Sequence, residues 1–213
     1  MLEQINQPIC GNINRKINGK INEQITSCTR CNLHKGLPIG LTPVKGKGNL
    51  NAQILIVNST ISKESSYLQE PFGQQETLIL RRVIKKSGLI LANFYFTSAV
   101  KCYGEDIKSQ HIQSCKLHLW NEIQAIKPKV IVLLGKPATK LLLKKQIGSN
   151  FNLEDVICKF YGVVFQDIIP ACYIVPLYSI EYLANQGKEE FEKVETVFCG
   201  IKHILDLGLI AKE

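Results

Sequence analysis

Short apolar runs that alternate with amphipathic segments constrain the fold of this chain more than any other feature of its sequence. The apolar runs lie at 54–57, 94–97 and 130–134. Runs of this kind are typical of strands that are buried on both faces of a sheet. Helical periodicity follows at 75–88 and 109–126, and Pro137 can open a third helix after the last run. This alternation predicts a three-layer α/β/α sandwich with a mainly parallel central sheet.

Two more strands are expected at 163–165 and 173–175, and a last helix at about 188–207. In open parallel sheets, ligands bind in the crevice at the carboxyl ends of the strands. The loops at that edge follow Val57, Thr97, Leu134 and Val175. We therefore expect the functional site to be built from these loops.

The first 26 residues differ in composition from the rest of the chain. Isoleucine recurs every four residues from Ile5 to Ile25, and asparagine follows four of these isoleucines. Because Gly11 and Gly19 weaken a continuous helix, we expect a low-complexity lead-in over 1–26, helical only near its end. The remainder, 27–213, is expected to form one domain.

The hydropathy of the chain excludes several classes of protein. No window approaches the roughly 20 consecutive apolar residues of a membrane span. The N-terminus also lacks the apolar core of a signal peptide. We expect an intracellular, cytoplasmic monomer with no membrane partner.

Basic residues are concentrated in one part of the chain. Residues 1–150 hold 21 of the 26 Lys and Arg residues but only 8 of the 18 Asp and Glu residues. A basic body with an acidic tail is typical of a polyanion binder, and a solvated lysine-rich surface is the alternative. The candidate DNA contacts are Arg81, Arg82, Lys85, Lys86, Lys101 and Lys136.

The eight cysteines include two spaced pairs. Cys28 and Cys31 form a CxxC motif that can hold one metal centre. Cys102 follows the second predicted strand, and Cys115 lies on the inward stripe of the helix after it. Four thiolates suit either tetrahedral zinc or an iron–sulfur cluster, and the spacing leaves both open.

Several segments together resemble the iron–sulfur uracil-DNA glycosylases of families 4 and 5. The matching segments, from about 27 to 183, include CTRCNL at 28–33, AQILIV at 52–57, FYFTSAVKC at 94–102 and IKPKVIVLLGKPATKLLL at 126–143. The resemblance implies the fold of that superfamily. It also implies a [4Fe–4S] cluster, with zinc as the alternative, on Cys28, Cys31, Cys102 and Cys115.

The resemblance also implies how a damaged base would be bound. Phe72 stands where the family stacks a flipped base. Tyr182 or Leu183 stands where a side chain enters the DNA helix. The implied chemistry is hydrolysis of an N-glycosidic bond in base-excision repair, and the implied partner is DNA.

The catalytic positions depart from the family pattern. Serine replaces the water-activating glutamate at Ser59, the base-reading asparagine at Ser98 and the oxygen-stabilising histidine at Ser179. A serine hydroxyl forms hydrogen bonds but carries no charge near neutral pH. Glu64 and Glu70, which flank the first loop, are candidate substitutes for the lost carboxylate.

Because of these departures, the sequence leaves two functions open. We expect a DNA-binding protein that excises a damaged base, with weak or absent activity on uracil. The alternative is a non-catalytic DNA-binding or accessory protein on the same scaffold.

Overall fold

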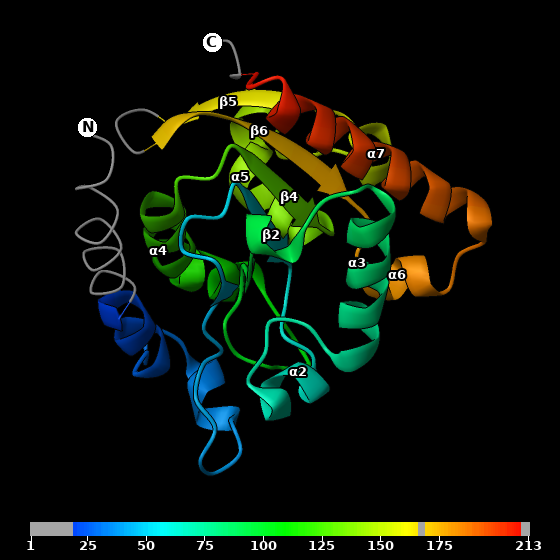
Figure 1. Cartoon of the computed structure of the whole chain (residues 1–213). Coiled ribbons are helices and arrows are strands. Elements are labelled where there is room, and N and C mark those ends of the chain that lie inside the picture. Colours follow the sequence, from blue (N-terminus) through cyan, green and yellow to red (C-terminus); the bar gives the residue numbers. More distant parts are fainter. Residues whose placement is uncertain (1–18, 166–168, 210–213) are drawn as a thin grey trace.

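The computed structural model describes residues 19–165 and 169–209, which form a six-stranded sheet flanked by helices (Figure 1). The strands are β1 (Lys47–Gly48), β2 (Ile54–Asn58), β3 (Phe94–Ser98), β4 (Val130–Leu134), β5 (Tyr161–Phe165) and β6 (Ile169–Leu177). Their order across the sheet is β1-β3-β2-β4-β6-β5. The four central strands are parallel, whereas β1 and β5 pair antiparallel at the two edges. The predicted mainly parallel sheet is confirmed.

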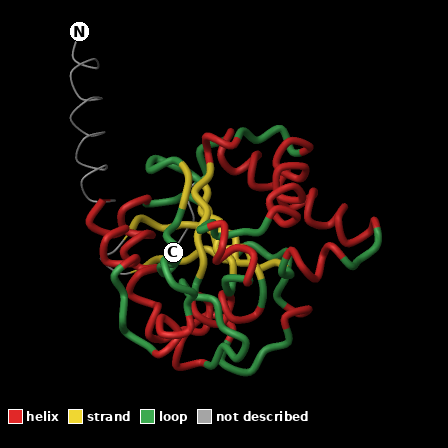
Figure 2. Tube along the Cα trace, turned by 90° about the horizontal axis from the view of Figure 1, so that it is seen from below, coloured by secondary structure: helices red, strands yellow, loops and turns green. Residues whose placement is uncertain are grey.

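Helices cover both faces of this sheet, and Figure 2 shows the strands between them. The helices are α2 (Lys63–Leu68), α3 (Gln74–Lys86), α4 (Ser109–Ile126), α5 (Lys136–Ile147), α6 (Ile180–Ala184) and α7 (Lys188–Asp206). Residues 19–26 are also helical. Three 3₁₀ turns lie at Asn32–Gly36, Leu91–Asn93 and Leu153–Asp155.

Two apolar clusters, one on each face of the sheet, form the core. One cluster joins α3, α6 and α7 to side chains such as Ile56 and Val132. The other joins α4 and α5 to the alternate side chains of the same strands, such as Leu55 and Ile131. Because both faces are covered, β2 is apolar up to Val57 and β4 is apolar throughout, as the sequence predicted.

The carboxyl ends of the central strands lie in register at one edge of the sheet. Asn58 of β2 is in register with Ser98 of β3 and Leu134 of β4, and Leu134 is in register with Leu177 of β6. We call these four residues the strand-end row. Since side chains alternate along a strand, the row lies on the same face as Ile56 and therefore toward α3. In Figure 1, α2 and α6 lie at this end of the sheet, where α3 begins.

Three elements at this end and edge were not predicted from the sequence. The strand β1 has two residues, and α2 and α6 have six and five, too few to show a periodic pattern. The predicted helix over 109–126 matches α4, although Lys108 rather than Ser109 occupies the N-cap position. Most of the low-complexity lead-in, residues 1–18, lies outside the described residues. Among the described residues, no helix is long and apolar enough to cross a membrane.

Candidate functional site at the strand ends

Ser59 is fixed by hydrogen bonds to the backbone of a neighbouring segment. It directly follows β2, is 7% exposed, and donates from Oγ to the Leu134 carbonyl at 2.6 Å. The same oxygen accepts the Ala138 backbone N–H at 3.2 Å. The hydroxyl therefore joins β2 to the start of α5, and its hydrogen-bonding capacity is largely used by the fold.

Ser179 has a local structural role as the N-cap of α6. Its hydroxyl accepts the Tyr182 backbone N–H at 3.3 Å. A side chain at Gly135 would contact Ser59 and Ser179, so the two serines lie close to the same glycine. Gly135 also has a φ of +89°, which favours glycine. The predicted loops after β2, β4 and β6 therefore meet at one place.

Ser98 differs from the other two serines because its hydroxyl has no partner. It is the last residue of β3, is fully buried, and makes no hydrogen bond within the described part of the chain. Its neighbour in the strand-end row is Asn58. A buried hydroxyl without a partner is costly, so this position is poised to bond a group that the fold does not supply.

The two glutamates predicted as substitutes bind different elements. Glu64, in α2, is exposed and accepts the Gln74 backbone N–H at 3.3 Å. Glu70 is ion-paired with Lys47 of the edge strand β1. Both residues are near the site, but neither contacts the three serines.

Glu76 is a third carboxylate, which was not singled out from the sequence. It is the third residue of α3, and its Oε2 accepts the Gly73 backbone N–H at 2.8 Å. The Asn58 side chain is close enough to this carboxylate to lower its pKa. Burial raises the pKa of Glu76, and the nearby carboxylates of Glu181 and Glu64 raise it further. The signal that could have found it is the Gly-x-x-Glu spacing of a capping box at 73–76.

Phe72 lines a cavity of about 640 Å³ beside α3. The ring is 4% exposed and packs edge-to-face against Phe96 at 6.1 Å between centroids. Lys47, Glu70 and Arg81 also line this cavity, but the three serines do not. The predicted stacking residue thus faces an apolar space with charged groups around it.

The two predicted wedge residues differ in exposure. Leu183 is 1% exposed and packs in the core, so the prediction that it enters DNA is wrong for this structure. Its neighbour in the short helix α6, Tyr182, is 43% exposed. The Tyr182 ring packs against the Tyr178 ring, with 4.3 Å between the ring centroids. Tyr182 is therefore the residue of the pair that can reach a partner.

The four predicted cysteine ligands converge on one region. Burial raises the pKa of Cys102 to about 12, and the negative charges of Cys115, Cys31 and Cys28 raise it in the same direction. Burial also raises the pKa of Cys115, whereas the nearby Lys101 backbone acts in the opposite direction. Among the described residues, no three His, Cys, Asp or Glu side chains are grouped tightly enough to hold a single metal ion. The thiols are thus close enough to interact but are not arranged around one ion.

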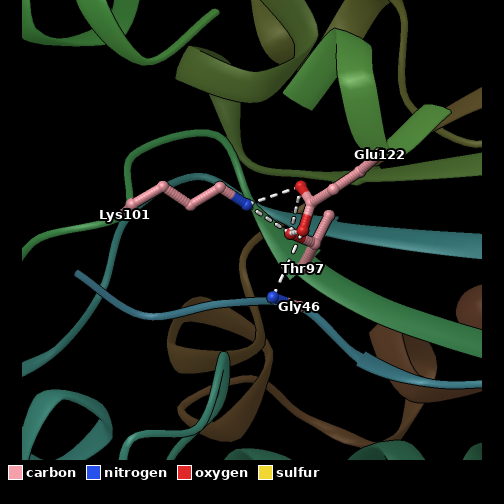
Figure 3. Close-up of polar contacts among 4 residues, drawn as sticks. All are labelled: Gly46, Thr97, Lys101 and Glu122. Carbon is pink, nitrogen blue, oxygen red and sulfur yellow. Dashed lines mark hydrogen bonds and ion pairs between the residues drawn. The ribbon is translucent and has the colours of Figure 1, made fainter. Parts of the chain in front are cut away.

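A buried ion pair lies next to these cysteines (Figure 3). Lys101 Nζ donates to Glu122 Oε2 at 2.6 Å and to the Thr97 hydroxyl, and each charged side chain is 1% exposed. The Gly46 backbone N–H donates to Glu122 Oε1 at 3.2 Å, and any side chain at Gly46 would collide with Glu122 and Tyr95. The prediction that Lys101 binds DNA is therefore wrong, because its charge is used inside the protein.

The sequence relationships agree with this geometry. The family model described as the uracil DNA glycosylase superfamily matches residues 45–199. The chain belongs to this superfamily. The match includes Cys102 and Cys115, whereas Cys28 and Cys31 lie before it.

Three relatives show the degree of sequence identity between this chain and other members of the superfamily. The type-4 uracil-DNA glycosylase of Archaeoglobus fulgidus is 30% identical over 67% of this chain and 70% of its own length. That of Sulfurisphaera tokodaii is 31% identical over 62% of this chain and 60% of its own length. That of Thermotoga maritima is 28% identical over 82% of this chain and 86% of its own length.

The other predicted DNA contacts of this superfamily member are at the surface. Arg81, Arg82 and Lys85 are exposed on α3. Lys86 is also exposed but forms an ion pair with Glu195 of α7 at 2.8 Å. At 1.5 Å rise per residue, the basic end of α3 is roughly 15 Å along the helix from Glu76. Lys136 is the first residue of α5, after the N-cap Gly135, and its Nζ lies 5.6 Å from the Phe151 ring centroid.

The strand ends combine polar groups with an aromatic ring. The loop after β2, however, has Ser59 at the position where the family pattern has a glutamate. Two serine hydroxyls stabilise the fold, and one is buried without a partner. Among the three glutamates described above, Glu76 is the one whose pKa is affected by a residue of the strand-end row, Asn58.

Proposed function

We propose that this protein binds DNA through the strand-end site of the uracil DNA glycosylase superfamily and excises uracil weakly or not at all. Breaking the bond between base and sugar leaves negative charge on the base and positive charge on the sugar. Fixed donors and a placed carboxylate stabilise these charges, and each such group contributes about 10²–10³ in rate. The serine positions supply neither a carboxylate nor a cation.

The hydrogen bonding of Ser59 is the observation that carries this proposal. Its Oγ donates to the Leu134 carbonyl and accepts the Ala138 N–H, so the hydroxyl is directed to the fold. A hydroxyl in this state cannot take a proton from water. In this chain, the loop in which the family has its carboxylate carries Ser59 instead, and the Ser59 side chain stabilises the fold.

The same proposal assigns a [4Fe–4S] cluster to Cys28, Cys31, Cys102 and Cys115. The other three cysteines are close enough to Cys102 to raise its pKa, and the Lys101 backbone is close enough to Cys115 to lower the pKa of that thiol. In a four-iron cluster each cysteine binds a different iron, which needs a wider arrangement than a single zinc ion. When bound, the cluster supplies redox-capable iron and cross-links the N-terminal segment, the loop after β3 and α4.

A non-catalytic DNA-binding function is the second candidate, and the structural use of the serines favours it. Ser179 caps α6 and Ser59 joins β2 to α5, so both serines are accounted for without catalysis. The stacking residue Phe72 and the exposed Tyr182 would still bind an unpaired base, because stacking needs no particular hydrogen-bond pattern.

One paired experiment separates the two candidates. Single- and double-stranded oligonucleotides with uracil, hypoxanthine or xanthine are tested for base release and, in the same buffer, for binding by fluorescence anisotropy. We expect binding whose log K changes by about −0.7 to −0.9 per phosphate contact against log salt. Slow release of one base supports the glycosylase, and binding without any release supports the accessory protein. Salt-independent binding, or no binding at low salt, would overturn the proposal.

A further inference from the structure

We propose that Glu76 supplies the carboxylate of the strand-end site and faces the cationic sugar that forms when the glycosidic bond breaks. This inference rests on the proposed DNA-binding function and names the group that gives this site its residual chemistry. It replaces Glu64 and Glu70, the two substitutes that the sequence suggested.

A backbone hydrogen bond fixes the Glu76 carboxylate near the strand-end row. The Gly73 backbone N–H donates to Oε2 at 2.8 Å, and the Asn58 side chain is close enough to the carboxylate to lower its pKa. Asn58 is itself held, since Oδ1 accepts the Ser59 backbone N–H at 2.9 Å and Nδ2 donates to the Pro71 carbonyl at 3.3 Å. An amide nitrogen has two hydrogens, so Asn58 can serve both Pro71 and Glu76.

Ser98 provides an independent sign that a ligand belongs beside this carboxylate. It is the neighbour of Asn58 in the strand-end row, on the face toward α3, and is fully buried. Its hydroxyl has no partner among the described residues. A donor held next to Asn58 without an acceptor fits a site whose last polar group comes from a bound molecule.

The charged groups around Glu76 suit a proton acceptor. Glu181 of α6 and Glu64 of α2 face it with like charge, and burial acts in the same direction, so its pKa is raised from the ordinary value. A carboxylate whose pKa is closer to neutrality is a better general base. Glu70 is instead ion-paired with Lys47, and the exposed Glu64 accepts the Gln74 backbone N–H at the start of α3.

The hydrolytic step balances with water as the only co-reactant. The C1′–N bond breaks, and its electron pair stays on the departing base. The oxygen of water bonds to C1′, and one water proton goes to the Glu76 carboxylate and then to the base. The products are the free base and an abasic sugar, and Glu76 is restored.

The test uses the whole protein and two abasic analogues in single-stranded DNA. One analogue is a pyrrolidine whose ring nitrogen is cationic near neutral pH, and the other is a neutral tetrahydrofuran. The ratio of their dissociation constants cancels effects on general DNA binding. We expect the wild-type protein to prefer the cationic analogue about tenfold or more at pH 8, and to lose the preference as Glu76 becomes protonated at lower pH.

Three variants sharpen this measurement. Glu76→Gln keeps a side chain that can accept the Gly73 N–H, and it should abolish the preference at every pH. Glu190→Gln changes the corresponding third residue of α7 and should leave the preference intact. Glu181→Gln removes a like charge from beside Glu76, lowers the pKa of Glu76, and should shift the loss of preference to lower pH.

The outcomes separate the inference from the function on which it rests. If both analogues bind and Glu76→Gln keeps the wild-type preference, the inference is overturned and the DNA-binding function stands. If neither analogue binds more tightly than undamaged DNA of the same sequence, the proposed function fails and the inference fails with it. A purely structural Glu76 would change the melting temperature without changing the ratio of the two affinities.

Discussion

The cysteine region and the strand-end site both lie beyond the carboxyl end of β3, where Cys102 follows Ser98 by four residues, yet they match the expected residues to very different degrees. Around the cysteines, all four expected ligands are present, and the Lys101–Glu122 pair ties the loop after β3 to α4. At the strand ends, all three expected polar residues are serine. One region keeps the residue types that the resemblance implies, and the other does not.

The difference teaches that fold and reaction depend on separate residues in this chain. Ser59 and Ser179 hold the loops in place with hydrogen bonds, so the shape of the site survives without the family's charged groups. A site of this kind can retain binding after it has lost rate, because shape and stacking give affinity whereas charges placed for the transition state give catalysis. The following predictions test each side of the comparison.

The largest effect is expected in the cysteine region. Cys102→Ser should lower the iron content of anaerobically purified protein from about four atoms per chain to less than about one, with loss of the brown colour. Cys158→Ser is the control, since Cys158 is packed beside the α3 and α7 cluster and is not one of the four proposed ligands. Stoichiometric zinc without sulfide in the wild-type protein would contradict the assignment.

The buried ion pair should give the next largest effect. Lys101→Met leaves Glu122 charged and unpaired in the interior, which typically costs about 3–5 kcal/mol. Lys86→Met, which breaks the partly exposed pair with Glu195, should cost only about 0–1 kcal/mol. Urea denaturation followed by circular dichroism measures both free energies of unfolding. Equal costs would show that the Lys101–Glu122 network does not hold the loop to α4.

Substitution of the serines should change the stability of the protein less, and Ser59 and Ser98 should differ in the direction of the change. Ser59→Ala leaves the Leu134 carbonyl and the Ala138 N–H without a partner and should cost about 1–3 kcal/mol. Ser98→Ala removes a hydroxyl that has no partner, so stability should stay the same or rise. Thermal unfolding of the two variants measures the difference. A loss at Ser98 as large as that at Ser59 would mean that Ser98 is already hydrogen bonded in the free protein.

The sequence predicted the central layers well because their signals are local. The run at 54–57 and the stripe over 109–126 correspond to β2 and α4, since apolar burial alone decides them. The edge strand β1 was missed because two residues carry no pattern. The strand pairing of β1 depends on β3, which is distant in sequence.

Parts of the site were misjudged because their partners come from distant segments. Lys101 has the sequence context of a surface cation, but its partner Glu122 lies on the buried stripe of α4. A carboxylate on that stripe was the available signal, because a buried charge requires a counterion. Glu76 was overlooked because its position in α3 is typical of a helix cap. The neighbours that give it another role, Asn58 and Glu181, belong to β2 and α6.

The central claim is that excision is limited by the three serine positions while binding is preserved. The most direct measurement is the single-turnover rate of uracil release from single-stranded DNA by the wild-type protein and by a Ser59→Glu, Ser98→Asn, Ser179→His variant with equal cluster content and DNA affinity. We predict slow or undetectable release by the wild-type protein and a gain of about 10² or more in the variant. Rapid, repeated turnover by the wild-type protein, or no gain in a folded variant that still binds DNA, would contradict the account.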